Sequence, residues 1–244
     1  MRNFLELGMF NKLFSCARAF LLLVCFSPVV THAQVIVIGI AGGTGSGKAT
    51  LAKQLKNAFG DDITIISQDS YYKELGHLSV EERALVNFDH PNPLDFGLLR
   101  EHLLKLKQFS AVNIPVYDFK THMRSVEVTA VEPKHVIIVE GILLFAAPEV
   151  KDLFDVRIFV DTDNHIRLLR RIDRDMRERA RSFGSIHAQY LATVKPMHDL
   201  FVEPSKQYAQ LIIPGAHNNA VAVETLVAKI RADLALAAEI EPGC

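Results

Sequence analysis

The sequence predicts an α/β fold built on a doubly wound parallel β-sheet, with an antiparallel β-ribbon inserted beside the sheet. Three observations predict this fold. Short runs rich in Val and Ile alternate along the chain with longer segments that carry apolar residues at helical spacing. A glycine-rich turn joins the first apolar run to the first helical segment. Acidic residues follow several of the runs, at the sheet edge where ligands of such folds bind.

The strands are expected where the sequence is almost continuously apolar and β-branched. Such runs are typical of parallel strands that are covered by helices on both faces. The ribbon is expected over residues 114–131, where apolar and polar residues alternate in patches. The predicted strands of the main sheet are residues 35–40, 63–67, 136–141, 156–161 and 211–214.

Helices are expected where apolar side chains recur every three to four residues. The first begins at the glycine-rich turn and ends at Gly60, because glycine is a common helix stop. An arginine-rich segment follows the strand predicted at 156–161. The predicted helices are residues 47–59, 96–107, 164–181, 185–194 and 221–238.

The glycine-rich turn contains Gly42-x4-Gly47-Lys48, which is typical of a loop that binds the phosphates of a nucleoside triphosphate. Glycines let successive backbone N–H groups turn toward a phosphate, and the following helix N-terminus adds partial positive charge. Lys48 is expected to reach the β- and γ-phosphates. The alternative is a plain turn between strand and helix. The expected nucleotide-binding residues are Gly42, Gly43, Thr44, Gly45, Ser46, Gly47, Lys48, Ala49 and Thr50.

Ala49 departs from this motif, because a Ser or Thr hydroxyl at that position holds Mg²⁺. Thr50 is no simple substitute, since one step along a helix rotates the side chain by about 100°. The sequence therefore predicts triphosphate binding with one metal contact missing.

Two carboxylates at predicted strand ends suit phosphoryl transfer, which needs a metal and a group that orients the acceptor hydroxyl. Asp69 is a candidate base, although an Asp here can also cap the following turn or helix. Glu140 stands between a buried strand and Gly141, as a carboxylate that holds Mg²⁺ or its waters does; the alternative is an exposed strand end. We expect Glu140 and Asp69 to form the metal site.

The arginine-rich segment at 164–181 is interpreted as a lid that closes over the triphosphate. Guanidinium groups suit phosphate because they are forked and permanently charged. One alternative is a solvated helix face, partly neutralised by Asp173, Asp175 and Glu178. Another is a nucleic-acid surface, which the net charge of −1 disfavours. The arginines are Arg167, Arg170, Arg171, Arg174, Arg177, Arg179 and Arg181.

Composition places the chain among ordinary globular proteins. It has 244 residues, of which 49% are hydrophobic and 23% charged. The near-neutral charge gives no bulk attraction to nucleic acid or to anionic membranes. The cysteines Cys16, Cys25 and Cys244 lie outside the expected folded body, so disulfides and zinc sites are not expected.

Taken in order, these segments resemble the uridine kinase (uridine–cytidine kinase) family over most of the chain. The resemblance implies a P-loop kinase that phosphorylates the 5′-hydroxyl of uridine or cytidine with ATP or GTP and Mg²⁺. It also implies a cytoplasmic homotetramer. The matching segments are residues 42–48, 67–72 (SQDSYY), 87–91 (NFDHP), 115–119 (PVYDF), 139–142 (VEGI), 159–162 (FVDT) and 203–209 (EPSKQYA).

The resemblance implies a nucleoside site. A carboxylate suits vicinal ribose hydroxyls, aromatic faces stack on a flat base, and Tyr or His donates to a pyrimidine carbonyl. Alternatively, Tyr117 and Phe88 are core residues, and His122 is a surface histidine or one whose hydrogen bonds are made within the protein. The implied contacts are Asp89 and Arg171 on the ribose side, Gln189 as a further contact, Tyr117 and His122 at the base edge, and Tyr72, Phe88 and Phe119 around the ring.

The resemblance also assigns the phosphate-transfer residues. Asp69 orients the 5′-hydroxyl and acts in catalysis with Lys48 and Arg174. The lid arginines are Arg174, Arg179 and Arg181, with Arg179 and Asn218 on the nucleotide and Arg181 on the substrate side.

Besides Ala49, two positions depart from the family pattern. Ala180 stands where glycine separates two lid arginines, a change that we expect to matter little. Gly215 stands where arginine is usual near the adenine pocket, which can alter the preference for the donor. The rival interpretations are a kinase for a phosphorylated sugar, as in phosphoribulokinase, or for pantothenate, and a nucleotide-binding protein with little catalysis.

Residues 1–33 differ from the rest of the chain. Basic residues precede an apolar run at 19–26, and Thr31-His32-Ala33 has small residues where a signal peptidase cleaves. The run is too short to span a membrane. A secretory signal and a folded helical extension are two interpretations. We favour a third, an over-long gene model with its natural start at Val30, because ATP is a cytosolic donor. The expected kinase domain is residues 34–240.

Overall fold

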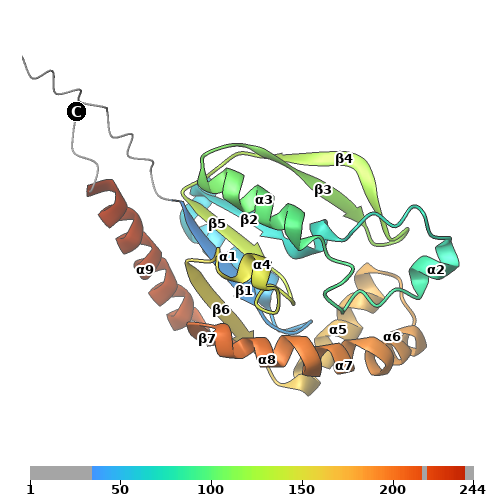
Figure 1. Cartoon of the computed structure of the whole chain (residues 1–244). Helices are drawn as coiled ribbons and strands as arrows, with labels where there is room; N and C mark the ends of the chain where they lie inside the picture. The colour runs from blue at the N-terminus through green and yellow to red at the C-terminus, as the bar shows by residue number, and fades with distance from the viewer. Residues whose placement is uncertain (1–34, 216–218, 240–244) are drawn as a thin grey trace, which may run out of the picture. The chain divides into compact units, whose positions relative to one another are not determined.

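The computed structural model of the chain describes residues 35–215 and 219–239 and has the predicted α/β fold (Figure 1). The main sheet has five parallel strands in the order β2-β5-β1-β6-β7. Each predicted strand is confirmed, with its ends shifted by a residue at most. The strands are β1 (Ile36–Ala41), β2 (Ile63–Ser67), β5 (Val136–Glu140), β6 (Val156–Asp161) and β7 (Leu211–Pro214).

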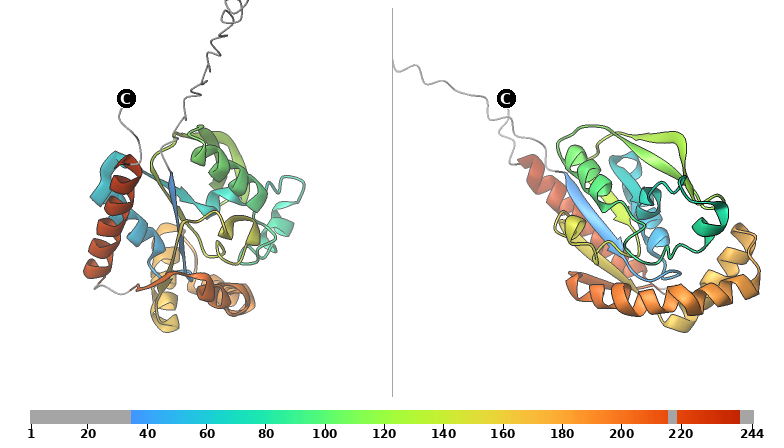
Figure 2. Two further views of the ribbon diagram at one scale, coloured as in Figure 1. Left: turned by 60° about the vertical axis from the view of Figure 1, so that its left-hand side comes forward. Right: turned by 45° about the vertical axis from the view of Figure 1, so that its right-hand side comes forward.

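Helices cover both faces of this sheet (Figure 2). On one face lie α1 (Lys48–Phe59) and α9 (Ala220–Glu239). On the other face lie α3 (Phe96–Lys107) and the short α4 (Pro148–Lys151). This arrangement is the doubly wound architecture that alternating strands and helices predict.

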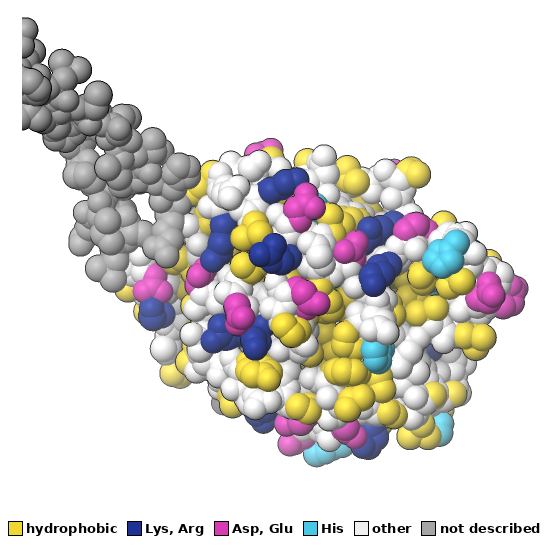
Figure 3. Space-filling view, in the orientation of Figure 1, with side chains coloured by type: hydrophobic (Ala, Val, Ile, Leu, Met, Phe, Trp, Pro, Cys, Tyr) yellow, Lys and Arg dark blue, Asp and Glu magenta, His cyan; other side chains and the backbone are white. Residues whose placement is uncertain are grey.

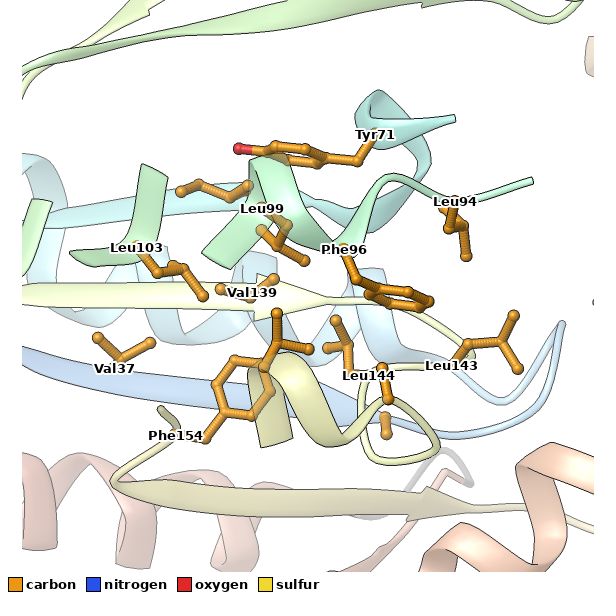
Figure 4. Close-up of a cluster of buried hydrophobic side chains, with 14 of the residues drawn as sticks. Val37, Tyr71, Leu94, Phe96, Leu99, Leu103, Val139, Leu143, Leu144 and Phe154 are labelled. Atoms are coloured by element: carbon orange, nitrogen blue, oxygen red, sulfur yellow. The ribbon is translucent and has the colours of Figure 1, made fainter. Parts of the chain in front are cut away.

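Each face of the sheet has its own apolar core. Successive residues of β1 enter opposite cores, because strand side chains alternate in direction: Val37 packs on the α3 side and Ile38 on the α1 side. In the first core, Leu99 and Leu103 of α3 lie over Val139 of β5 (Figure 4). These fully buried side chains hold the strand ends in register.

The inserted ribbon is confirmed as a separate antiparallel pair, β3 (Val112–Asp118) with β4 (Met123–Val131). The register of the pair shifts between Pro115 and Tyr117. Such an irregularity bends the strand and re-aims the side chains beyond it. Tyr117 is buried at this end of the ribbon, whereas most of β4 is exposed.

The prediction of a helix to residue 181 is wrong at its end. The helix α5 spans Asn164–Glu178, and Ala180 has a left-handed backbone with φ of 51°. The Arg181 N–H then donates to the Asp175 carbonyl, at 3.1 Å. A left-handed residue cannot continue a right-handed helix, so the arginines after Glu178 lie on a turn.

The helical region predicted at 185–194 is part of a longer run. It continues through two π-helical turns, which widen the helix by one residue. Residues 195–208 were not predicted as helical. The run consists of α6 (Phe183–Gln189), a π-turn (Tyr190–Val194), α7 (Lys195–Met197), a second π-turn (His198–Val202), α8 (Glu203–Ser205) and a 3₁₀ turn (Lys206–Tyr208).

Three short elements were also missed. Gly60 does end α1, but a 3₁₀ turn follows at Gly60–Asp62. Another 3₁₀ turn, Gln68–Tyr71, follows β2 directly. The helix α2 (Val80–Ala84) begins with a capping box in which Ser79 and Glu82 exchange hydrogen bonds with each other's backbone.

The interpretations offered for residues 1–33 lie outside the described residues. In the part of the chain that is described, no helix has the length and apolar character needed to cross a membrane. Basic and acidic side chains are interspersed on the face drawn in Figure 3, in keeping with the net charge of −1.

Gly39→Ala is expected to destabilise the fold by about 1–3 kcal/mol, because it overpacks a filled core. A Cβ at Gly39 would lie 2.8 Å from Cγ of Phe154 and 2.9 Å from Cε1 of Phe145, and both rings are buried. Urea unfolding followed by circular dichroism measures the change. Gly97→Ala is the control, since its Cβ meets nothing closer than 3.7 Å and lies in a helix. Equal stability of the two variants would contradict this account of the core.

Candidate functional site

The site is built around the loop between β1 and α1. Gly42, Gly45 and Gly47 have positive φ of 144°, 75° and 104°, which side chains with a Cβ rarely adopt. Gly47 caps α1 with no side-chain hydrogen bond, so the first N–H groups of the helix are left for another acceptor. The backbone conformation is therefore that of an anion cradle at a helix N-terminus.

Lys48 is buried beside this cradle, and its Nζ donates to the Gly43 carbonyl at 3.2 Å. Burial lowers the pKa of its ammonium, while the nearby carboxylates of Glu140 and Asp69 raise it. Ser46 is fully buried and its hydroxyl has no hydrogen-bond partner among the described residues. The loop thus combines a lysine with unpaired polar groups, as the motif predicts.

Arginine side chains of α5 donate hydrogen bonds to backbone carbonyls of the loop. Arg170 donates to the carbonyls of Gly45 (3.5 Å) and Gly215 (2.8 Å). Arg167 donates to the carbonyls of Thr44 (3.5 Å) and Thr162 (3.1 Å) and contacts Nε2 of His198. Burial lowers the pKa of His198 to about 4, so the imidazole is neutral at physiological pH. Arg167 and Arg170 therefore support the backbone of the loop.

Two carboxylates and a hydroxyl meet at the carboxyl ends of β2 and β5. Ser67 and Glu140 are direct neighbours in the parallel register, and the Ser67 hydroxyl donates to Oε1 of Glu140 at 2.8 Å. The same hydroxyl accepts from the Asp69 N–H at 3.3 Å. Burial and then the charge of Glu140 raise the pKa of Asp69 to about 6. Glu140 is thus close enough to disfavour the charge of Asp69.

These carboxylates fit a hydrated Mg²⁺ ion. No three or more His, Cys, Asp and Glu side chains in the described residues are grouped so as to hold a metal on their own. Mg²⁺ usually takes one or two carboxylates and completes its shell with water and substrate phosphates. Ala49 and Thr50 are both exposed in the first turn of α1, and Ala49 has no oxygen to offer.

The lid arginines gather around one buried carboxylate, Asp175. This residue has 0% exposure, and four arginines lie within ion-pair distance of it. Burial of such a charge is costly unless it is paired, so Asp175 and the arginines stabilise each other. The shortest N···O distances to Asp175 are 3.6 Å for Arg171, 2.8 Å for Arg174, 3.7 Å for Arg179 and 3.6 Å for Arg181.

The lid also faces the loop and the carboxylates. The charge of Arg174 lowers the pKa of Lys48, and the charges of Arg179 and Arg174 lower that of Asp69. Ala180 lies between two of the arginines in a left-handed conformation, which costs a residue with a Cβ about 1–2 kcal/mol. This backbone favours glycine, so alanine has a conformational cost at this position. That the change matters little for function stays a prediction.

An aromatic cluster forms the neighbouring wall. Tyr72 and Tyr117 are buried with ring centroids 5.0 Å apart, and Phe88 meets Tyr117 edge-on at 6.4 Å and 62°. No slot for a flat base is left between Phe88 and Tyr117. His122 is stacked on Phe88 at 4.6 Å and 12°, with Nδ1 3.4 Å from the Tyr117 hydroxyl. The rings expected around a base are thus together, and they are in contact with one another.

Further contacts connect this cluster to the rest of the site. Phe119 is 42% exposed, and the Arg179 guanidinium lies 4.9 Å from the centre of its ring. The charge of Asp69 contributes to the raised pKa values of Tyr72 and Tyr117. The aromatic cluster, the lid and Asp69 therefore surround one region.

Asp89 and Arg171, the residues expected on the ribose side, are both buried. Burial raises the pKa of Asp89, and Arg171 counteracts this shift. Arg171 donates to the Thr44 hydroxyl at 3.1 Å and to Oε1 of Gln189 at 2.9 Å. Arg181 donates to the same Gln189 oxygen at 2.5 Å. Arg171 thereby connects the glycine loop with the substrate side.

The structure brings most of the expected site residues to one region. It also places there residues that the sequence did not assign to the site. Asn218 lies outside the described residues. Asp175 was noted only as a partial neutraliser, although its spacing of four residues from Arg171 and Arg179 was visible in the sequence. Ser67 opens the matching segment 67–72, but its hydrogen bond to Glu140 is not visible in the sequence. No sequence signal points to Thr193, because its partner Asp89 lies far away in the chain.

A phosphate cradle, a lysine and strand-end carboxylates on a doubly wound sheet define a P-loop protein of the phosphotransferase type. Residues 37–222 match the family model described as Phosphoribulokinase / Uridine kinase family. The chain belongs to this family.

Curated relatives agree with this assignment, and a solved structure has a similar fold. The chain is 51% identical over 197 residues to the protein named Uridine kinase of Clostridium novyi (strain NT), covering 80% of this chain and 95% of the relative. It is 52% identical over 198 residues to that of Halalkalibacterium halodurans, covering 81% and 94%. The fold resembles phosphoribulokinase from Rhodobacter spheroides, with a TM-score of 0.57, 12% identity, and coverage of 75% of this chain and 71% of that one.

Asp69→Asn is expected to stabilise the fold above pH 6. The folded protein keeps a proton on Asp69 up to a pKa of about 6, whereas the unfolded chain releases it near the ordinary 3.8. The free energy of unfolding therefore falls as pH rises from about 3.8 to about 6. Asn cannot ionise, so the Asp69→Asn variant does not lose this stability. We expect a gain of about 1–3 kcal/mol at pH 8 that disappears near pH 4, measured by urea unfolding. Exposed Asp61→Asn is the control, and a gain independent of pH would contradict the assignment.

Proposed function

We propose that this chain is a uridine kinase that phosphorylates the 5′-hydroxyl of uridine, cytidine or both, using ATP or GTP with Mg²⁺, in pyrimidine salvage. The observation that carries the proposal is the position of Asp69. Its charge acts on Lys48 on one side and on the rings of Tyr72 and Tyr117 on the other. A carboxylate between the phosphate cradle and an aromatic wall has the place of a base for an acceptor hydroxyl. The relatives named Uridine kinase support the nucleoside as acceptor.

On the donor side, the backbone N–H groups of residues 42–48 bind the phosphates, and Lys48 neutralises their charge. Arg174 and Arg179 are close enough to Asp69 to lower its pKa, and they stabilise charge on the transferring group. Since phosphoryl transfer needs little covalent help from the protein, this positioning accounts for most of the catalysis.

On the acceptor side, Asp69 accepts the proton of the 5′-hydroxyl as the phosphate transfers. A pKa of about 6 keeps Asp69 ionised at neutral pH while leaving it basic enough to take up a proton. Ser67 holds the neighbouring Glu140 by a hydrogen bond, so the two carboxylates keep distinct orientations.

Mg²⁺ would be held by Glu140 and Asp69 together with the phosphates, and it would neutralise charge on the transferring group. Ala49 removes the hydroxyl that the motif supplies, so these carboxylates are the protein's contribution to metal binding. We propose that the ion binds weakly as a result.

The nucleoside is held by charge on its ribose side and by aromatic rings at its base. Asp89 accepts from ribose hydroxyls, with Arg171 and Gln189 beside it. Neutral His122 and the Tyr117 hydroxyl read the pyrimidine edge, since burial lowers the pKa of His122. Arg181 reaches the same side through Gln189.

We further propose that residues 34–240 form the kinase domain, and that the enzyme is a cytoplasmic homotetramer without nucleic-acid or membrane partners. The family membership supports these proposals, and the requirement for ATP supports the compartment. The alternatives are a nucleotide-binding protein with little catalysis, for which Ala49 is the argument, and a kinase for a sugar phosphate. The aromatic cluster favours a nucleoside over a sugar phosphate, which would need more basic residues there.

A coupled assay of nucleotide consumption tests the proposed reaction. Uridine and cytidine are expected to be phosphorylated, whereas ribulose 5-phosphate and pantothenate are not. Asp69→Asn should lower kcat by about 10²–10⁴-fold, the usual contribution of a general base. Activity should rise with pH through about 6, as Asp69 loses its proton. Tight binding of ATP without turnover of any acceptor would instead support the binding protein.

Ala49→Thr is expected to lower the Mg²⁺ concentration for half-maximal rate by about ten-fold or more and to raise turnover, because it supplies the missing hydroxyl. Ala49→Val has the same shape without the oxygen and is the control. Both side chains are tolerable at this exposed position. Magnesium titrations at saturating nucleotide measure the effect. Identical midpoints for the Thr and Val variants would contradict it.

A further inference from the structure

We propose that Thr193 is a positioning residue that orients the carboxylate of Asp89 toward the ribose, and so helps this site to select a ribonucleoside over its deoxy analogues. The inference rests on the proposed function, in which Asp89 accepts from the ribose hydroxyls. It adds a residue that lies far from every motif in the sequence.

The contact joins two distant parts of the chain. Oγ1 of Thr193 lies 3.1 Å from Oδ2 of Asp89 and 3.2 Å from the Gln189 carbonyl oxygen. Thr193 is half-buried in the π-helical turn Tyr190–Val194, and Asp89 is 9% exposed. Single π-turns within helices often occur at functional sites, because they re-aim side chains that a regular helix would point elsewhere.

A threonine in a helix usually donates to the carbonyl four residues earlier, and the Gln189 contact has that form. However, the hydroxyl has only one proton, and both acceptors lie within its reach. A carboxylate is the stronger acceptor because hydrogen bonds to charged groups are shorter and stronger. The Thr193 hydroxyl therefore donates to Oδ2 of Asp89 while the carboxylate is ionised. This hydrogen bond lowers the pKa of Asp89 and so favours the ionised form.

Because of this hydrogen bond, the two carboxylate oxygens of Asp89 have different surroundings. Oδ2 is held by Thr193, whereas Oδ1 has no hydrogen-bond partner in the described part of the chain. No arginine or lysine there forms an ion pair with Asp89 within 4.0 Å, although Arg171 acts on its charge. A carboxylate held through one oxygen keeps the other free, in a fixed direction, for vicinal hydroxyls.

The same helical segment is fixed to the lid. Oε1 of Gln189 accepts from Arg171 at 2.9 Å and from Arg181 at 2.5 Å. Arg171 in turn reaches the Thr44 hydroxyl of the glycine loop. The position of Thr193, and with it the direction of Asp89, therefore depends on the lid arginines being in place.

The test compares Thr193→Val, which keeps the shape and removes the hydroxyl, with Thr193→Ser, which keeps the hydroxyl. Steady-state kinetics are measured with uridine and with 3′-deoxyuridine on the full chain. The preference for uridine, as a ratio of kcat/KM values, is expected to fall about ten-fold in the Val variant, the usual loss for a hydrogen bond to a charged group. The Ser variant should retain the preference within about two-fold. The KM for ATP should not change in either variant.

A merely structural role for Thr193 would lower activity with both nucleosides equally and leave their ratio unchanged, and that result would overturn the inference. If Thr193→Val does not fold, as judged by its melting temperature, Thr193→Ala takes its place with the same expectation. A wild-type enzyme that phosphorylates uridine but does not distinguish it from 3′-deoxyuridine overturns the inference while leaving the proposed function intact. A wild-type enzyme that phosphorylates neither overturns both.

Discussion

The parallel pairing of β5 with β1 on one side and β2 on the other is the constraint on which the rest of the site depends. It places Glu140 opposite Ile40 and Ser67, which lie two residues before Gly42 of the glycine loop and two residues before Asp69, respectively. Backbone hydrogen bonds therefore fix the spacing between the phosphate cradle and the carboxylates. Because a strand that slips by one residue turns every side chain to the other face, the two cores over β1 also protect the geometry of the site.

The lid is organised by a different physical requirement. Four arginines lie within ion-pair distance of the buried carboxylate of Asp175. The buried carboxylate reduces the repulsion among the arginines and lets them collect near Lys48 and Asp69 before any phosphate is present. Their surplus of positive charge remains available to an anion, which is the electrostatic preorganisation that phosphoryl transfer requires.

Local pattern was sufficient to predict the sheet, the glycine loop and the positions of Lys48, Asp69 and Glu140 beside it, because each depends on residues that are neighbours in the chain. The end of α5 was not predictable from periodicity, since arginines at helical spacing continue past the point where Ala180 reverses the backbone. The π-turns were equally hidden, because they depend on how the helical run packs. Thr193 has its partner 104 residues away, a distance that only the folded chain bridges.

The stacking of His122 on Phe88 has a kinetic consequence. The imidazole already covers the aromatic face that a pyrimidine ring would use, and its own backbone is left-handed, with φ of 54°. In the proposed nucleoside complex, an incoming ring must therefore exchange places with a side chain rather than enter a vacant slot. Ligand capture then includes a rearrangement step, and association is slower than diffusional encounter allows.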